Sequence, residues 1–265
     1  MLDKKQLAII KKDFKSITSS KRMMSAIVAM PIVMAVVIPV LFISIILFTP
    51  EDSSDMAELM QILPKNTSIN DGGIRGMLIG IILNYVIPMF FLLIPIMASS
   101  VMASSSFVGE KEKKTLETLL YCPLPLKDIF SAKILASFFL SMLVSIFSFI
   151  MMIIVIQIFL LIAQGAFFGP GVNWLTMMLL VSPAAALISI NLIVRGSAKS
   201  QTSEEAQQSS LFLILPVILL LIGQFTGIMM MGPIVFLVLG AVLAVIALFT
   251  LKSSYKKFNY EALLR

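Results

Sequence analysis

The residues best placed to do chemistry lie in one charged segment, 108–133, between two long apolar runs. Three leucines in it recur at i, i+3 and i+4, which predicts an amphipathic helix over about residues 109–122. Glu110 and Lys114 form an i,i+4 pair in the favourable order, and two prolines end the helix because proline lacks an amide and disfavours helical geometry before it. We expect this segment to face water and the helix to lie at a membrane surface. The leucines are Leu116, Leu119 and Leu120, and the prolines are Pro123 and Pro125.

The remaining residue types argue against catalysis by this chain. It has no histidine, which removes the usual general base and the commonest transition-metal ligand. Its single cysteine, Cys122, cannot form an intramolecular disulfide and is best interpreted as a small apolar filler. Residues 196–200 read GSAKS and lack the glycines of a phosphate-binding loop. We therefore expect no catalytic, cofactor-binding or metal-binding residues, and no enzyme activity of its own.

Four carboxamide side chains fall within the apolar runs, and they have two possible roles. They line a translocation path, or they form hydrogen bonds that hold membrane helices together. Charged residues stay out of the apolar runs, with Arg195 at an end, and this argues against a proton-driven antiporter because such carriers keep intramembrane carboxylates. The candidates for the path are Asn84, Gln157, Asn191 and Gln224.

The elements that position these residues are membrane helices. Hydrophobic residues make up 59% of the 265, charged residues 13%, and the mean hydropathy is +1.03, far from the composition of soluble domains. The sequence predicts an all-α integral membrane protein that forms a single transmembrane domain over residues 1–265. Its six spans are expected at about 23–48, 77–106, 129–163, 174–195, 211–230 and 232–251. Pro88 and Pro95 indicate kinks in the second span, and Trp174 is expected to anchor the fourth at the membrane interface.

Charge predicts how the chain is oriented. Residues 1–22 form a basic amphipathic helix, with an apolar stripe that includes Leu7 and Phe14, which is typical of an interfacial helix on an anionic leaflet. A nucleic-acid-binding arm is a poor alternative because this stretch runs directly into a span. Of 20 Lys and Arg residues, only Lys65 and Arg75 fall in the connections expected outside. The positive-inside rule therefore places both termini and the charged segment in the cytoplasm.

The charged segment resembles the region between the second and third spans of type-2 ABC exporter permeases, where a coupling helix packs against an ATPase subunit. Residues 203–210, with an acidic pair before AQQ, resemble a second intracellular motif of that family. The resemblance implies a plasma-membrane permease subunit that works as a homodimer with two copies of an ABC ATPase, which bind ATP and magnesium. The coupling residues would be Gly109, Glu110, Lys111, Glu112, Thr115, Leu116, Glu117, Leu119 and Leu120, with Pro123 and Lys133 completing the match.

The cargo is left open by the sequence. A hydrophobic, peptide, antibiotic or lipid-like molecule is ranked above an ion, because a sodium or other ion exporter would have to build its site from amides and carbonyl groups alone. A different class, a non-transporting scaffold or sensor subunit, also agrees with the composition. Recovery of a soluble ATPase with the protein would separate these interpretations.

Overall fold

The computed structural model describes residues 4–19, 21–49, 73–115, 125–165, 167–197, 199–225 and 232–257. Every regular element in these ranges is helical, and six of the helices are long and apolar enough to cross a membrane. The prediction of an all-α integral membrane protein with six spans is confirmed.

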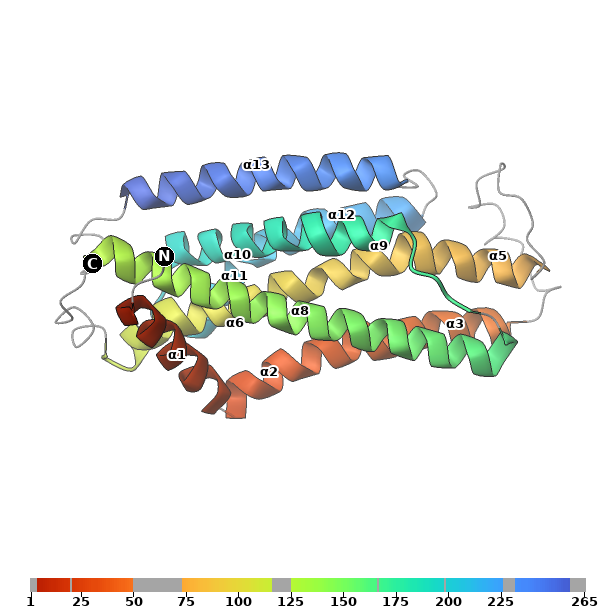
Figure 1. Cartoon of the computed structure of the whole chain (residues 1–265), viewed down its shortest axis with the longest axis horizontal. Helices are drawn as coiled ribbons and strands as arrows, with labels where there is room; N and C mark the ends of the chain where they lie inside the picture. Colours follow the sequence, from red (N-terminus) through yellow and green to blue (C-terminus); the bar gives the residue numbers. More distant parts are fainter. Residues whose placement is uncertain are drawn as a thin grey trace.

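Several helical segments follow one another without a break to form the spans. The first three spans are α2 (Lys21–Ile32) with η1 (Val33–Val37) and α3 (Ile38–Phe48), then α5 (Gly73–Ile81) with η2 (Ile82–Val86) and α6 (Ile87–Glu112), then α8 (Leu126–Gln164). The fourth is α9 (Val172–Thr176) with η3 (Met177–Val181) and α10 (Ser182–Gly196), and the last two are α12 (Leu211–Phe225) and α13 (Pro233–Lys257). α11 (Ser203–Gln208) precedes α12 and belongs with it to the fifth candidate span, Ser203–Gln224, whereas α1 (Lys4–Ser19) lies outside the spans (Figure 1).

The second and fourth spans form the centre of the bundle. Their most apolar windows are 67% and 72% buried, whereas the other four spans are 17–28% buried. The outer helices therefore present wide apolar faces, as expected for helices that face lipid. In Figure 1 α6 and α10 run between α13 on one side and α2 and α3 on the other.

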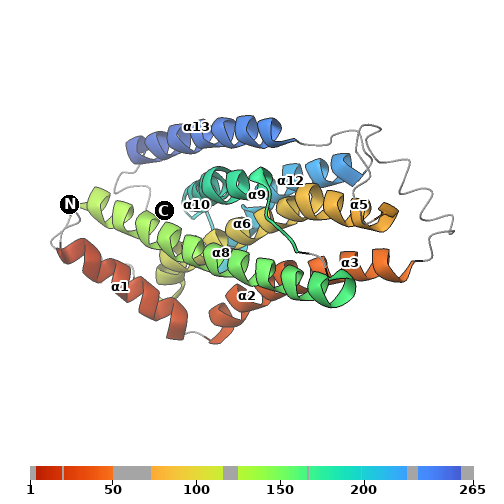
Figure 2. The ribbon, with the colours of Figure 1, turned by 45° about the vertical axis from the view of Figure 1, so that its right-hand side comes forward.

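The bundle has two ends of different chemistry. We call the end with α1, the last turn of α6 and the first turns of α8 the charged end, because every Asp, Glu, Lys and Arg of the six candidate spans lies close to it. The opposite, or far, end holds α5 and α9. Figure 2 shows α1 at the charged end, beside the start of α8, with which it is in contact.

Proline residues explain the three π-helical segments. Each segment ends two residues before a proline, at Pro39, Pro88 and Pro183. A proline lacks an amide and its ring collides with the carbonyl four residues earlier, so the helix widens by one residue just before it. Because a widened turn leaves carbonyls without a main-chain donor, other groups must supply hydrogen bonds there.

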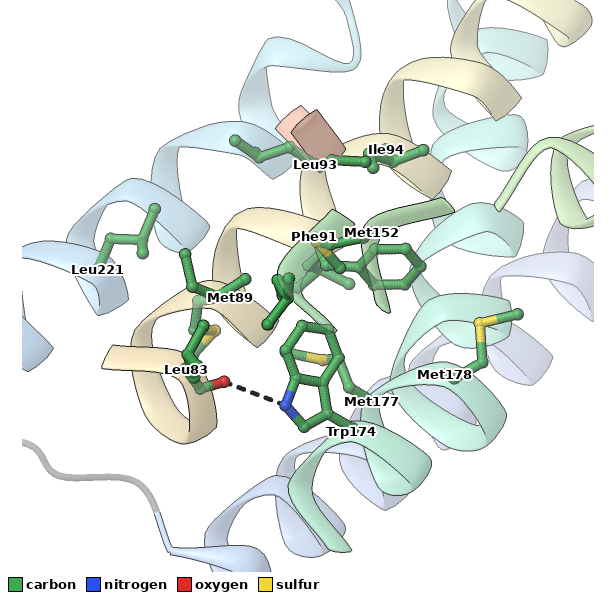
Figure 3. Close-up of a cluster of buried hydrophobic side chains, with 14 of the residues drawn as sticks. Leu83, Met89, Phe91, Leu93, Ile94, Met152, Trp174, Met177, Met178 and Leu221 are labelled. Carbon is green, nitrogen blue, oxygen red and sulfur yellow. Dashed lines mark hydrogen bonds between the residues drawn. The ribbon is translucent and has the colours of Figure 1, made fainter. Parts of the chain in front are cut away.

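The second span shows how these carbonyls are satisfied. A main-chain amide at position 88 would donate to Leu83 O in a π-helix or to Asn84 O in an α-helix. Proline has no amide hydrogen, so neither hydrogen bond forms. Trp174 Nε1 donates to Leu83 O at 3.0 Å (Figure 3). Asn173 Nδ2 donates to Asn84 O at 2.9 Å. Two consecutive side chains of α9 thus cap the two carbonyls that Pro88 leaves open.

This arrangement corrects the expected role of Trp174. Its side chain is completely buried, packs with the rings of Phe149 and Phe168, and belongs to the large apolar core, so it is not a membrane-interface anchor. The indole is instead the group that joins the fourth span to the bend in the second.

Candidate functional site

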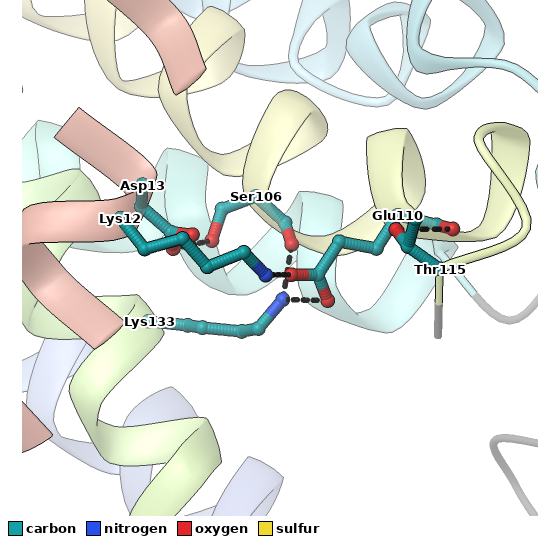
Figure 4. A network of polar contacts seen from close by, with 6 residues as sticks. All are labelled: Lys12, Asp13, Ser106, Glu110, Thr115 and Lys133. Atoms are coloured by element: carbon teal, nitrogen blue, oxygen red, sulfur yellow. Dashed lines mark hydrogen bonds and ion pairs between the residues drawn. The ribbon is translucent and has the colours of Figure 1, made fainter. Parts of the chain in front are cut away.

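The Glu110 carboxylate forms ion pairs with two lysines from different helices. Lys12 of α1 donates to Oε1 at 2.5 Å, and Lys133 of α8 donates to Oε2 at 2.5 Å (Figure 4). Lys133 also donates to the carbonyl of Ser106 and lies over the Phe107 ring, 5.5 Å from its centroid. One carboxylate on α6 therefore ties α1, α6 and α8 together.

Asp13 adds a second link between α1 and α6. Ser106 Oγ donates to Asp13 Oδ2 at 2.6 Å, and the Asp13 side chain is only 5% exposed. Burial raises the pKa of Asp13 above its ordinary value, because removal from water disfavours the charged form, while Lys133 and the hydrogen bond from Ser106 act in the opposite direction. We call Lys12, Asp13, Ser106, Glu110 and Lys133 the Glu110 cluster.

The Glu110 cluster corrects the expectation that the whole charged segment faces water. Glu110 is 7% exposed and Lys133 is 3% exposed, so the two ends of the segment are buried in the protein. Opposite charges in direct contact make this burial tolerable, since an unpaired charge would lose its hydration without replacement. The exposed residues that the structure describes in this segment are 112–115, Pro125 and Lys127.

The turn at residues 113–115 follows the last residues of the second span. Gly109, Glu110, Lys111 and Glu112 lie in the final turn of α6, which continues beyond the expected end at residue 106, so they do not begin a separate helix. Lys114 has a positive φ of 56°, and Thr115 donates from its amide to Glu110 O at 2.9 Å, so the helix ends here. The proposed docking residues Leu116, Glu117, Leu119 and Leu120 lie outside the described residues.

Glu112 joins the turn to the second charged connection. Its Oε2 accepts from Ser203 N at 3.1 Å and from Ser203 Oγ at 2.9 Å. Thr202 caps α11 by accepting from Glu205 N at 3.2 Å, while Gln201 N donates back to Glu205 Oε2 at 2.8 Å. The two segments singled out in the sequence are therefore in direct contact.

A pocket of about 190 Å³ lies between α1 and the end of α6. Residues of both helices and of the turn line it, and most of them have charged or hydroxyl side chains. Its lining residues are Lys12, Asp13, Ser105, Ser106, Gly109, Glu110, Lys113 and Thr115.

The four carboxamides in the spans do not converge on one site by any hydrogen bond between them. Asn84 Nδ2 donates to Gly80 O at 2.9 Å, Gln157 Oε1 accepts from Phe168 N at 3.0 Å, and Asn191 Nδ2 donates to Thr250 Oγ1 at 3.3 Å. These three hold helices and connections in place. Gln224 is 3% exposed, and among the residues that the structure describes neither of its polar side-chain atoms has a hydrogen-bond partner.

Sequence reasoning missed the α1 half of the cluster. Lys12 was interpreted only as part of a basic stripe, and Asp13 and Ser106 were given no role. The available signal was one acid among the basic residues of 11–15, but a local pattern does not reveal a contact across 93 residues of sequence.

Comparison with protein families gave a match over most of the chain. The family described as ABC-2 family transporter protein matches residues 7–256. A search of curated proteins and a search of solved structures gave no significant match.

Proposed function

Because this chain belongs to the ABC-2 transporter family and is the membrane subunit of a transporter, we propose that it is the permease of an ATP-driven exporter. A separate ABC ATPase, in two copies, binds ATP and magnesium and supplies the energy to a homodimer of this chain. The complex lies in the plasma membrane and exports a hydrophobic, peptide, antibiotic or lipid-like cargo.

The observation that carries this proposal is the position of the Glu110 cluster. It joins α1, α6 and α8 immediately before the exposed turn at Lys113 to Thr115, from which the proposed coupling segment continues. A force applied to that segment reaches three helices through one carboxylate. Glu112 extends the same connection to α11.

Charge distribution supports a cytoplasmic charged end and an external source of energy. The charged end carries the Lys and Arg residues of the candidate spans, so the positive-inside rule places it in the cytoplasm with both termini. The middle of each candidate span holds no Asp, Glu, Lys or Arg with which to relay protons. An ATPase that docks at the charged end supplies what the spans lack.

Two variants separate docking from coupling in the complex purified with its ATPase and reconstituted in vesicles. Leu116→Asp should release the ATPase, because it puts a charge into the apolar stripe that we assign to docking. Glu110→Gln should leave the ATPase bound but lower the amount of cargo moved per ATP hydrolysed. Lys252→Gln, an exposed charge on α13 at the same end, serves as the control and should change neither.

The proposal is wrong if no ATPase is recovered with the wild-type protein, as expected of a scaffold or sensor subunit. It is also wrong if Glu110→Gln leaves transport per ATP unchanged. An ion exporter would instead show ATP-dependent movement of sodium under the same conditions.

A further inference from the structure

Gln224 lies on the face of α12 that packs against the protein. Val217 and Leu221, each 6% exposed, precede it by seven and three residues and so share its face. This face of α12 meets α6 and η2, and in Figure 3 Leu221 lies across from Leu83 and Met89 of that span. The carboxamide therefore occupies apolar surroundings at the far end of the bundle.

Within the described part of the chain, both polar side-chain atoms of Gln224 are buried without a hydrogen-bond partner. A carboxamide in apolar surroundings costs free energy when its hydrogen bonds are not made, and methionine would fill similar space without that loss. The side chain is only 3% exposed in the single chain, so contact with a second copy is not needed to bury it. A bound molecule that reaches this position would gain the hydrogen bonds that the carboxamide can make.

The chemistry of the side chain limits what that partner is. A carboxamide offers a donor and an acceptor in one plane, which match the acceptor and donor of a secondary amide. A metal cation would use only the oxygen, and a hydrocarbon chain would use neither atom. The neighbouring Val217 and Leu221 suit an apolar body around the amide.

The neighbouring element gives the partner a way in. η2 is a widened turn whose main-chain hydrogen bonding is interrupted at Pro88, and such a site is a natural place for a membrane helix to bend. Movement of η2 away from the end of α12 would uncover Gln224.

We propose that Gln224 is a cargo-contacting residue that hydrogen-bonds an amide group of an otherwise apolar, peptide-like cargo. The proposal rests on the proposed transport function and narrows its cargo class. It selects peptide-like molecules over hydrocarbon lipids and ions.

The test uses the full chain alone in phospholipid vesicles, without nucleotide. Trp174 is the only tryptophan and belongs to the same apolar core as Leu221, so a bound quencher near Gln224 should lower its fluorescence. The probe is a capped dipeptide amide carrying 4-nitrophenylalanine, and its fully N-methylated form, which has lost the amide donors, is the matched probe. The wild-type protein should bind the first probe more tightly.

Gln224→Met should weaken binding of the amide probe roughly 10- to 100-fold, the factor for one or two hydrogen bonds, and remove the preference over the N-methylated form. Asn191→Leu, which removes a carboxamide from α10 near the charged end and far along the span from Trp174, is the control and should keep the preference. The proposal is overturned if Gln224→Met keeps the preference, or if the wild-type protein does not bind the amide probe. Because no ATPase takes part, failure here is distinct from failure of ATP-driven export.

Discussion

Glu110→Gln should destabilise the protein, and the structure sets the size of the effect. The variant removes the negative charge but keeps the shape, so Lys133, which is 3% exposed, stays buried while its contacts with the Ser106 carbonyl, the Phe107 ring and the new carboxamide are all with neutral groups. Breaking a buried ion pair in this way costs about 3–5 kcal/mol. The Lys12 side chain is 51% exposed and can return to water, so that pair contributes less than about 1 kcal/mol.

This reasoning ranks three variants of the Glu110 cluster. Glu110→Gln and Lys133→Met should each lower the free energy of unfolding by roughly 3 kcal/mol or more, whereas Lys12→Met should lower it by less than about 1 kcal/mol. The measurement is reversible unfolding in mixed micelles with increasing SDS. The double variant Glu110→Gln with Lys133→Met should lose clearly less than the sum of the two. Additive losses, or an equal loss for Lys12→Met, would refute the proposed division of energy between the two lysines.

Three further predictions concern other parts of the chain. Burial raises the pKa of Asp13 above its ordinary value of 3.8, so the folded state holds the proton of this carboxyl group more tightly than the unfolded state does. The free energy of unfolding should therefore fall as pH rises from about 3.8 through the folded-state pKa. Asp13→Asn should remove this part of the pH dependence of SDS unfolding. Trp174→Phe should lower the free energy of unfolding by about 1–3 kcal/mol, since it leaves Leu83 O buried without a donor, and a loss near zero in the same assay would contradict the capping role. Cys122 is the only cysteine, so a membrane-impermeant maleimide should label the protein in inside-out vesicles and not in intact cells; the reverse pattern would place the charged end outside.

Long apolar runs were sufficient to predict the fold class and the six spans. A membrane helix must satisfy its own main-chain hydrogen bonds and present apolar side chains over some 20 residues, so length and composition reveal it locally. Pro88 was also recognisable as a place of helix distortion, because a proline within a helix removes one of its main-chain hydrogen bonds. These are properties of single segments, and no knowledge of packing is needed to recognise them.

Burial of the charged residues could not be predicted in this way. Glu110 and Lys133 were expected in water because isolated charges avoid apolar surroundings, and only the approach of α1 and α8 to α6 makes their burial possible. The burial of Trp174 was not predicted either, since an indole at the start of a span normally lies at the membrane interface. Trp174 donates to the Leu83 carbonyl, which lacks a main-chain donor only because of Pro88. Pro88 lies 86 residues before Trp174, and no local sequence pattern connects the two positions.

The two ends of the bundle are held closed by different chemistry, and this bears on where energy must be supplied. At the charged end, Lys12 can leave Glu110 and be hydrated at little cost because half of its side chain is already in water. At the far end, separation of Trp174 from Leu83 leaves a donor and an acceptor without partners in an apolar core. Detachment of α1 from the charged end is therefore cheap, whereas separation of α8 from α6 there breaks the buried Glu110–Lys133 pair at a cost of about 3–5 kcal/mol. Loss of the Trp174–Leu83 hydrogen bond at the far end costs less, about 1–3 kcal/mol. Work applied at the charged end should therefore move α6 and α8 together, and the far end is where these two spans can separate from their neighbours.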